Sequence, residues 1–140
     1  MKKFLITGAL GQIGSELILA LCERYGAKNV IITDKCPKPK GDFLSGCRFL
    51  EMDVTNEKQV AEIVEKFDIK VIYHLAALLS AVAEAKPQLA WDVNMNGLYN
   101  ILEVAREYDC SVFTPSSIGV FGPSTPQYKT PQDTIQRPNT

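Results

Sequence analysis

Apolar and polar positions alternate in blocks along this chain. Five short segments are almost continuously apolar, which is typical of parallel strands buried on both faces of a sheet. They cover residues 3–7, 30–34, 47–52, 71–75 and 111–114. Between them, apolar residues recur at helical spacing and predict helices over 12–25, 57–67 and 87–108. This alternation predicts an α/β fold with a doubly wound parallel sheet of about five strands.

The same spacing predicts which side of each helix is buried. The expected buried residues are Ile13, Leu17, Ala20 and Leu21 of the first helix, Val60, Ile63, Val64 and Phe67 of the second, and Leu89, Val93, Gly97, Ile101 and Ala105 of the third.

The sequence changes character after Gly122. Residues 123–140 are rich in proline and polar residues and show no apolar period. We therefore expect one domain over residues 1–122 and an irregular, proline-rich loop over 123–140. Residues 35–46, with prolines and glycines of their own, are also a predicted surface loop.

Three glycines at a strict three-residue spacing link the first predicted strand to the first helix. A Rossmann fold binds a dinucleotide at the tight turn between its first strand and its first helix. The pyrophosphate lies over the N-terminus of that helix. The expected contacts are Gly8, Gly11, Gln12, Ile13 and Gly14. The spacing G-x-x-G-x-x-G differs from the usual G-x-G-x-x-G, and a glycine-rich turn without a ligand is the alternative.

Acidic residues end the second and third predicted strands. Asp34 stands where a carboxylate accepts hydrogen bonds from the adenosine ribose and repels a 2′-phosphate, which favours NAD over NADP. Lys35 weakens that preference, and a turn-forming role is the alternative for Asp34. Asp53, followed by Val54, could reach the adenine amino group, and Thr55 or Asn56 could cap the next helix.

Small residues follow the fourth predicted strand and would let the cofactor ribose and nicotinamide lie close to the backbone. We expect these contacts from Ala76 and Ala77. His74 is the only histidine, and inside an apolar strand it is expected to be a satisfied core residue. Asn94 and Asn96 lie in the middle of the third helix, where asparagine is a poor helix former, so at least one should face a cleft.

Composition narrows the range of partners. The chain has 140 residues, a net charge of −1 and no basic run, so nucleic acid or an anionic membrane is not an expected partner. No apolar run approaches the about 20 residues of a membrane span, and we expect no signal peptide. The four cysteines form no C-x-x-C pair, so we expect free thiols in a reducing cytoplasm. No metal site is expected.

The glycines, Asp34, Asp53 and the run Pro115-Ser116-Ser117 together resemble an extended short-chain dehydrogenase/reductase. Residues 74–80, 89–98 and 114–126 resemble more closely the L-threonine 3-dehydrogenase branch, which is similar to the nucleotide-sugar epimerases. The resemblance implies oxidation of L-threonine by NAD to 2-amino-3-oxobutyrate. It also implies that Ser117 contacts the reacting hydroxyl, Ser116 and Asn94 lie near the nicotinamide, Leu75 and Ala76 line the ribose, and Ser80 lies near the substrate.

One part of the family pattern is absent. The catalytic base of the family is a tyrosine with a lysine four residues later, and none of the five tyrosines of this chain has that lysine. We therefore expect an N-terminal fragment of a longer enzyme, or a truncated gene product, inactive alone and prone to self-association, such as a homodimer. A nucleotide-sugar epimerase or dehydratase and a non-catalytic NAD-binding module are the alternatives.

Overall fold

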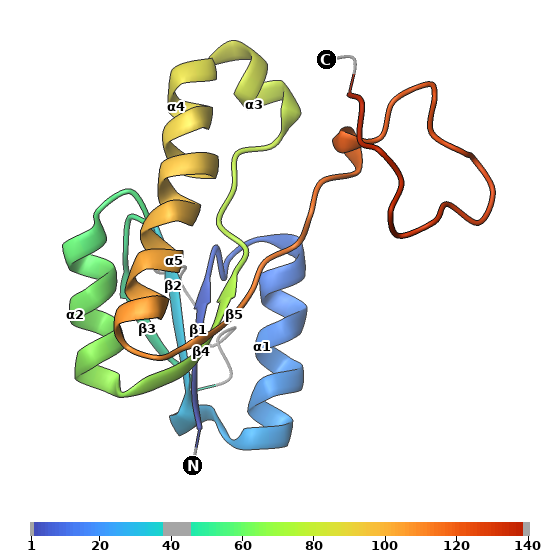
Figure 1. The fold of residues 1–140 in the computed structure, drawn as a ribbon. Helices are drawn as coiled ribbons and strands as arrows, with labels where there is room; N and C mark the ends of the chain where they lie inside the picture. Colours follow the sequence, from blue (N-terminus) through green and yellow to red (C-terminus); the bar gives the residue numbers. More distant parts are fainter. Residues whose placement is uncertain (1, 38–45, 139–140) are drawn as a thin grey trace.

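The computed structural model describes residues 2–37 and 46–138 (Figure 1). Its centre is a parallel sheet of five strands in the order β3-β2-β1-β4-β5. The strands are β1 (Lys3–Thr7), β2 (Val30–Asp34), β3 (Arg48–Glu51), β4 (Ile69–His74) and β5 (Ser111–Phe113). The predicted α/β fold with a doubly wound parallel sheet is therefore confirmed. The expected loop over 35–46 lies mostly outside the described residues.

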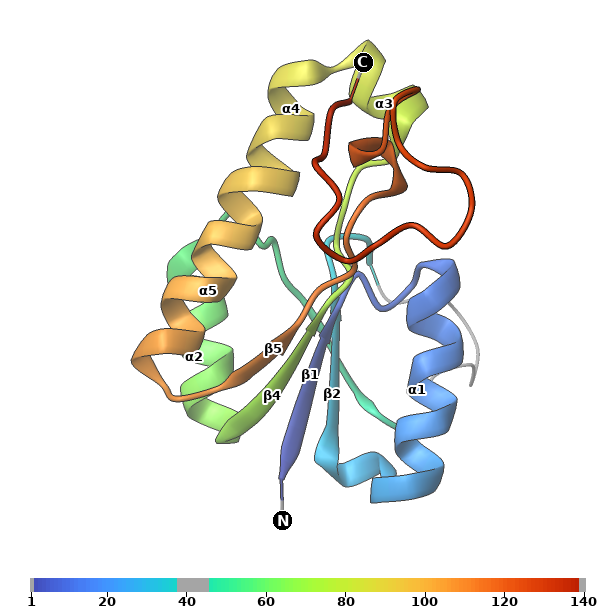
Figure 2. The same ribbon diagram turned by 45° about the vertical axis from the view of Figure 1, so that its right-hand side comes forward.

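Helices cover both faces of the sheet. They are α1 (Gln12–Tyr25), α2 (Glu57–Phe67), α3 (Ser80–Ala85), α4 (Pro87–Trp91) and α5 (Gly97–Glu107), with a π-helical turn over Asp92–Asn96 and short 3₁₀ turns over Ala27–Asn29 and Ile118–Val120. α1 lies on one face, and α2, α4 and α5 lie on the other (Figures 1 and 2). The alternating strand–helix connections place all strand carboxyl ends on one side of the molecule, where a ligand site of this fold is expected.

Local sequence signals explain where the first two helices end or begin. Gly26 terminates α1 with a φ of 82°, a conformation that favours glycine. Asn56 caps α2, because its side-chain oxygen accepts a hydrogen bond from the Gln59 N–H at 3.2 Å. Of the two caps that the sequence left open, Thr55 and Asn56, the structure uses Asn56.

Two apolar layers hold the sheet in place. Leu5, Ile31 and Ile72 pack toward α2 and α5, and Phe4, Ile6 and Ile32 pack toward α1. Because both layers are buried, the strand sequences are continuously apolar and do not alternate between apolar and polar residues.

Three of the predicted buried positions are wrong. Ile13 is 62% exposed and Ala20 is exposed, whereas Ile18 is buried. All six residues from Leu17 to Cys22 are apolar. The spacing of apolar residues therefore could not show which side of α1 packs against the sheet. Leu89 is 40% exposed because α4 extends past the carboxyl edge of the sheet (Figure 1).

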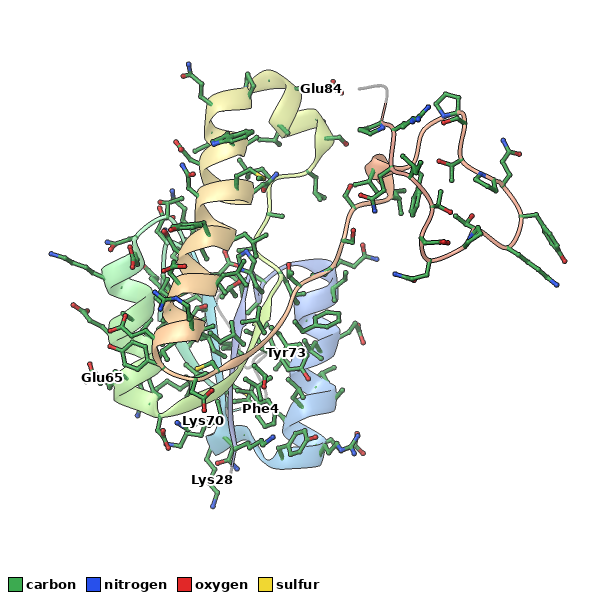
Figure 3. The ribbon with its side chains drawn as sticks, in the orientation of Figure 1. Phe4, Lys28, Glu65, Lys70, Tyr73 and Glu84 are labelled. Atoms are coloured by element: carbon green, nitrogen blue, oxygen red, sulfur yellow. The ribbon has the colours of Figure 1, made fainter. Side chains whose placement is uncertain are left out.

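The α1 face of the sheet is only partly covered. A row of aromatic rings runs from Tyr25 of α1 through Phe4 and Tyr73 to Phe113 on β5, with ring centroids 4.5, 6.4 and 5.8 Å apart in turn. Figure 3 labels Phe4 and Tyr73 in the middle of this row. Phe113 is 54% exposed at the edge of the sheet. The edge of the sheet at β5 is therefore apolar and exposed.

The last described residues form no helix or strand after Val120. They lie above the carboxyl ends of the strands, on the same side as α3 (Figure 2). The backbone of Gly122 lies directly against the carbonyl group of Arg137, so this segment is a closed loop rather than a tail. Residues 123–138 contain no helix or strand.

Candidate functional site

A groove with a volume of about 320 Å³ opens at the carboxyl ends of the strands. That volume lies at the low end of the range of small-molecule sites. Its lining residues are Gly8, Gly11, Asp34, Lys35, Cys36, Met52, Asp53, Val54, Leu75, Ala76, Ala77, Leu78 and Val93. The structure thus brings together most of the residues that the sequence predicted to contact a cofactor.

The glycine turn is shaped by the packing of the chain on itself. Gly8 has a φ of 64°, and a β-carbon there would lie 2.6 Å from the Ala76 nitrogen. A β-carbon at Gly14 would lie 2.6 Å from the Ala9 carbonyl oxygen. The prediction that all three glycines serve the approach of a phosphate is therefore incomplete. Gly11, which lines the groove, has only the Gly8 oxygen nearby, at 3.2 Å from such a carbon.

The N-terminus of α1 is free to bind an anion. Gly11 is its N-cap residue and supplies no side-chain cap, and the first turn holds no acidic residue. The backbone N–H groups of Gln12, Ile13 and Gly14 have no partner within the helix, since the first N–H groups of a helix have none. The side chains of Gln12 and Ile13 are exposed and do not line the groove, so their backbone would make any contact.

Asp34 links the ends of β1 and β2. Its Oδ2 accepts a hydrogen bond from the Leu10 N–H, and its Oδ1 accepts one from the Cys36 N–H, each at 3.0 Å. A carboxylate has about four acceptor positions, so this side chain can still accept two hydroxyl groups. The turn-forming role and the ligand-binding role that the sequence left open are therefore compatible.

Asp53 and Lys35 form an ion pair at the mouth of the groove. The Lys35 Nζ lies 2.6 Å from Oδ2 of Asp53, while Oδ1 accepts hydrogen bonds from the N–H and the hydroxyl of Thr55 at 3.0 and 2.8 Å. Burial opposes ionisation, but the hydrogen bonds from Lys35 and Thr55 hold the pKa of Asp53 below its ordinary value. From the sequence, the charge of Lys35 was expected to weaken the preference for NAD over NADP. In the structure, the Lys35 ammonium group is paired with the carboxylate of Asp53.

A buried pair supports the wall formed by residues 75–76. The Thr7 Oγ1 lies 2.8 Å from Nδ1 of His74 and accepts hydrogen bonds from the N–H groups of Leu75 and Ala76, each at 3.3 Å. The Thr7 hydroxyl and the His74 ring thus form one buried hydrogen bond. Burial lowers the pKa of His74 to about 4, so the ring is neutral. The expectation of a satisfied core histidine is confirmed.

Two asparagines of the π-turn and α5 fix the opposite walls of the groove. Asn94 accepts a hydrogen bond from the Leu78 N–H at 2.8 Å and donates one to the Leu78 oxygen at 3.1 Å. Asn100 donates to the Val54 oxygen at 3.0 Å. Asn96 is exposed and bonds only Asp92. The amide of Asn94, predicted to lie near the nicotinamide, is therefore used to hold Leu78.

The three predicted serines do not line the groove, and neither do Gln12, Ile13, Gly14 and Asn94. Ser80 is the first residue of α3, and Ser116 and Ser117 lie in the segment after β5; all three are exposed. The Ser117 Oγ accepts a hydrogen bond from the Gly119 N–H at 3.1 Å. α3 and the segment after β5 lie beyond the carboxyl ends of the strands (Figure 2), the end of the sheet at which the groove opens.

Five lining residues were not among the predicted contacts, namely Lys35, Cys36, Met52, Leu78 and Val93. Cys36 follows two residues after Asp34, and Met52 directly precedes Asp53. Extending each predicted contact by one or two positions in both directions along the chain would have found both. Val93 was assigned only to the core.

The described residues offer neither a metal site nor a helix that could span a membrane. No group of three or more histidine, cysteine or acidic side chains is placed to hold a metal ion in the part of the chain that the structure describes. Within the same residues, no helix is long and apolar enough to cross a membrane.

The parallel sheet, the glycine turn and the uncapped helix define a dinucleotide-binding Rossmann domain, and the groove lies at the strand carboxyl ends, where this fold binds its ligand. Residues 4–140 match the NAD dependent epimerase/dehydratase family. The chain therefore belongs to that family, whose cofactor is NAD, in agreement with the cofactor predicted from Asp34.

Comparisons with individual proteins agree with this family. An uncharacterized epimerase/dehydratase of Staphylococcus saprophyticus is 55% identical over 99% of this chain and 43% of its own length. The solved L-threonine dehydrogenase of Clostridium difficile is 55% identical, with a TM-score of 0.92, over 99% of this chain and 44% of its own. The UDP-glucose 4-epimerase of Thermotoga maritima is more distant, at 26% identity and a TM-score of 0.85, over 97% and 45%. The chain thus spans less than half the length of these relatives.

Proposed function

We propose that this chain is the NAD-binding part of an L-threonine 3-dehydrogenase, which oxidises L-threonine to 2-amino-3-oxobutyrate. The observation that carries the proposal is the 55% identity to the Clostridium difficile enzyme over 99% of the chain. The identity to the UDP-glucose 4-epimerase is 26%. The likeness to the dehydrogenase includes the segments outside the glycine turn, where enzymes of one family differ according to substrate.

The groove suggests how the chain would hold its cofactor. The N–H groups at the start of α1 would bind the pyrophosphate, and the free acceptor positions of Asp34 would bind the adenosine ribose. Asp53 and Val54 would border the adenine, and residues 75–77 would border the second ribose. Bound NAD supplies the acceptor for the hydride that leaves the substrate carbon.

Ser117 would act on the substrate hydroxyl. A serine hydroxyl has one donor and two acceptor positions, and the Gly119 N–H occupies one acceptor. The donor and one acceptor remain to orient the reacting group. Ser116 would lie beside the nicotinamide and Ser80 near the polar groups of threonine. No tyrosine of this chain is followed by lysine four residues later, so the catalytic base is not among these residues.

Two measurements test the proposal. The chain should bind NAD in a calorimetric titration, and Asp34→Ala should weaken that binding, while Asp133→Ala, at an exposed position of the irregular loop, should not. Equal affinities for all three proteins would remove Asp34 from the site. The parent enzyme should form NADH from L-threonine, whereas these 140 residues alone should show negligible turnover.

The alternatives give different results in the second measurement. An epimerase or dehydratase keeps its cofactor bound and produces no net NADH from threonine. A non-catalytic NAD-binding module binds NAD but turns over neither substrate. NADH formation by the parent with threonine is therefore the result that separates the three functions.

Self-association is part of the same proposal. Four large side chains on the outer side of the α4–α5 helix are exposed, namely Trp91 (61%), Met95 (49%), Tyr99 (62%) and Leu102 (47%). Their spacing of three and four residues places them on one helix face, which suits contact with a second copy of the chain. Light scattering should detect dimers or larger species, and a strictly monomeric chain would contradict this.

The cytoplasmic location predicted from the sequence also remains a proposal.

A further inference from the structure

Two cysteine sulfurs meet between α1 and the start of β3. The Sγ atoms of Cys22 and Cys47 are 2.7 Å apart, and both residues are free thiols. The sulfur–sulfur bond of a disulfide is about 2.05 Å long. A small adjustment of the two side chains would therefore bring the sulfurs to bonding distance, with no rearrangement of the sheet.

The surroundings of the two thiols differ. Cys47 is 7% exposed and packs with Ile18, Leu21 and Ile32 in the layer under α1. Burial, followed by the hydrogen bond with Cys22, raises the pKa of Cys47 to about 12. Cys22 is half-buried and can be reached from solvent. A reagent would consequently meet Cys22 first, with Cys47 directly behind it.

We propose that Cys22 and Cys47 form an oxidisable dithiol, a modification site at which a low-molecular-weight disulfide such as oxidised glutathione cross-links the chain. The Cys22 thiolate attacks one sulfur of the reagent, forms a mixed disulfide and releases one reduced thiol. Cys47 then attacks the Cys22 sulfur, and the second thiol leaves with the remaining proton. The two protein sulfurs lose two electrons, and the reagent gains them.

The site is separate from the cofactor groove. Cys22 lies in the last turns of α1, and Cys47 directly precedes β3, so both are near the amino ends of the strands. Neither residue lines the groove at the carboxyl ends. The cross-link would join the first helix to an edge strand and close a loop between residues 25 positions apart. In the chain-entropy account, a loop of this size raises the melting temperature by roughly 10 °C.

The test uses the whole chain with Cys36→Ser, which removes the exposed cysteine and leaves Cys22, Cys47 and Cys110. After incubation with oxidised glutathione, we expect the number of free thiols to fall by two and peptide mass mapping to find the Cys22–Cys47 pair. The melting temperature should rise and return to its starting value on reduction.

The outcomes that would overturn the proposal are equally direct. Glutathione retained on Cys22 with Cys47 still free would show that the pair does not close, and an unchanged thiol count would show that it does not react. In the matched variants Cys22→Ser and Cys47→Ser, no cross-linked peptide should form. If either variant fails to fold, peptide mass mapping of the oxidised wild-type chain still shows whether Cys22 and Cys47 are cross-linked.

Discussion

The side-chain amide of Asn94 and the backbone of Leu78 form a closed pair of hydrogen bonds. The amide oxygen accepts at 2.8 Å and the amide nitrogen donates at 3.1 Å, so both polar groups of Leu78 are satisfied by one side chain. Asn94 belongs to the π-helical turn, and such turns occur frequently at functional sites. Asn94 reaches the loop after β4 from this turn, and its neighbour Val93 lines the groove.

Asn94→Ala should loosen this wall of the groove. Two partly buried backbone groups would lose their partner, so we expect unfolding free energy to fall by about 1–3 kcal/mol and NAD to bind more weakly. Asn96→Ala is the matched control, because Asn96 is exposed and bonds only Asp92. Urea denaturation and calorimetry measure the two effects. Equal behaviour of both variants would remove the positioning role of Asn94.

Gly8 and Gly11 should respond differently to the same change. Gly8→Ala places a β-carbon against the Ala76 backbone in a left-handed conformation, so it should destabilise the fold by at least about 2 kcal/mol. Gly11→Ala should lower stability by about 1 kcal/mol or less, yet lower NAD affinity about tenfold because its β-carbon faces the groove. Thermal melts and NAD titrations distinguish the two. A Gly11→Ala chain with unchanged NAD affinity would move the pyrophosphate away from this turn.

The ion pair between Lys35 and Asp53 should influence cofactor preference. With Asp53→Asn, the lysine charge is no longer neutralised and becomes available to a 2′-phosphate. The ratio of NADP to NAD affinity should then rise by up to about fivefold, the scale of an exposed ion pair. The double variant Asp53→Asn with Lys35→Ala should show no rise. An unchanged ratio in the single variant would mean that Asp34 alone sets the preference.

His74 should make the fold sensitive to acid. Its pKa is lowered by burial to about 4 in the folded chain, against about 6.5 when unfolded. The unfolded state therefore binds the proton more readily, and the stabilisation is complete above about pH 6.5 and lost as the pH falls toward 4. The loss between about pH 7 and pH 4 is about 3 kcal/mol.

Urea denaturation across this pH range measures the effect, and the His74→Gln chain should lack this part of the pH dependence. The same slope in both chains would assign it to other groups. Asp53, whose pKa is lowered, loses its own stabilisation only at lower pH, below its ordinary range.

Much of the site could be predicted because it follows from strand ends. In a parallel sheet every strand delivers its last residues to the same edge, so Asp34, Asp53 and residues 75–77 were identified from the ends of apolar runs alone. The interactions that each of these side chains makes could not be predicted in this way. Lys35 and Asp53 come from neighbouring strands, and nothing in their spacing shows that they pair.

The third predicted helix shows the limit of periodicity. Residues 87–108 were expected to form one helix, and the structure interrupts it with the turn over Asp92–Asn96. A π-turn adds one residue without altering the apolar pattern strongly, so the sequence carries no clear signal for it. α3 was also missed, because Ser80–Ala85 is short and buries none of its residues.

The position of Trp91 gives the molecule a spectroscopic property. It is the only tryptophan of the chain, and it is exposed on the outer side of the α4–α5 helix, remote in sequence from every residue that lines the groove except Val93. Its fluorescence should therefore be that of an indole in water and should shift toward shorter wavelengths when a partner excludes the solvent from this helix. Trp91 thus gives the natural protein an intrinsic optical probe of the proposed assembly, and this probe requires no added dye.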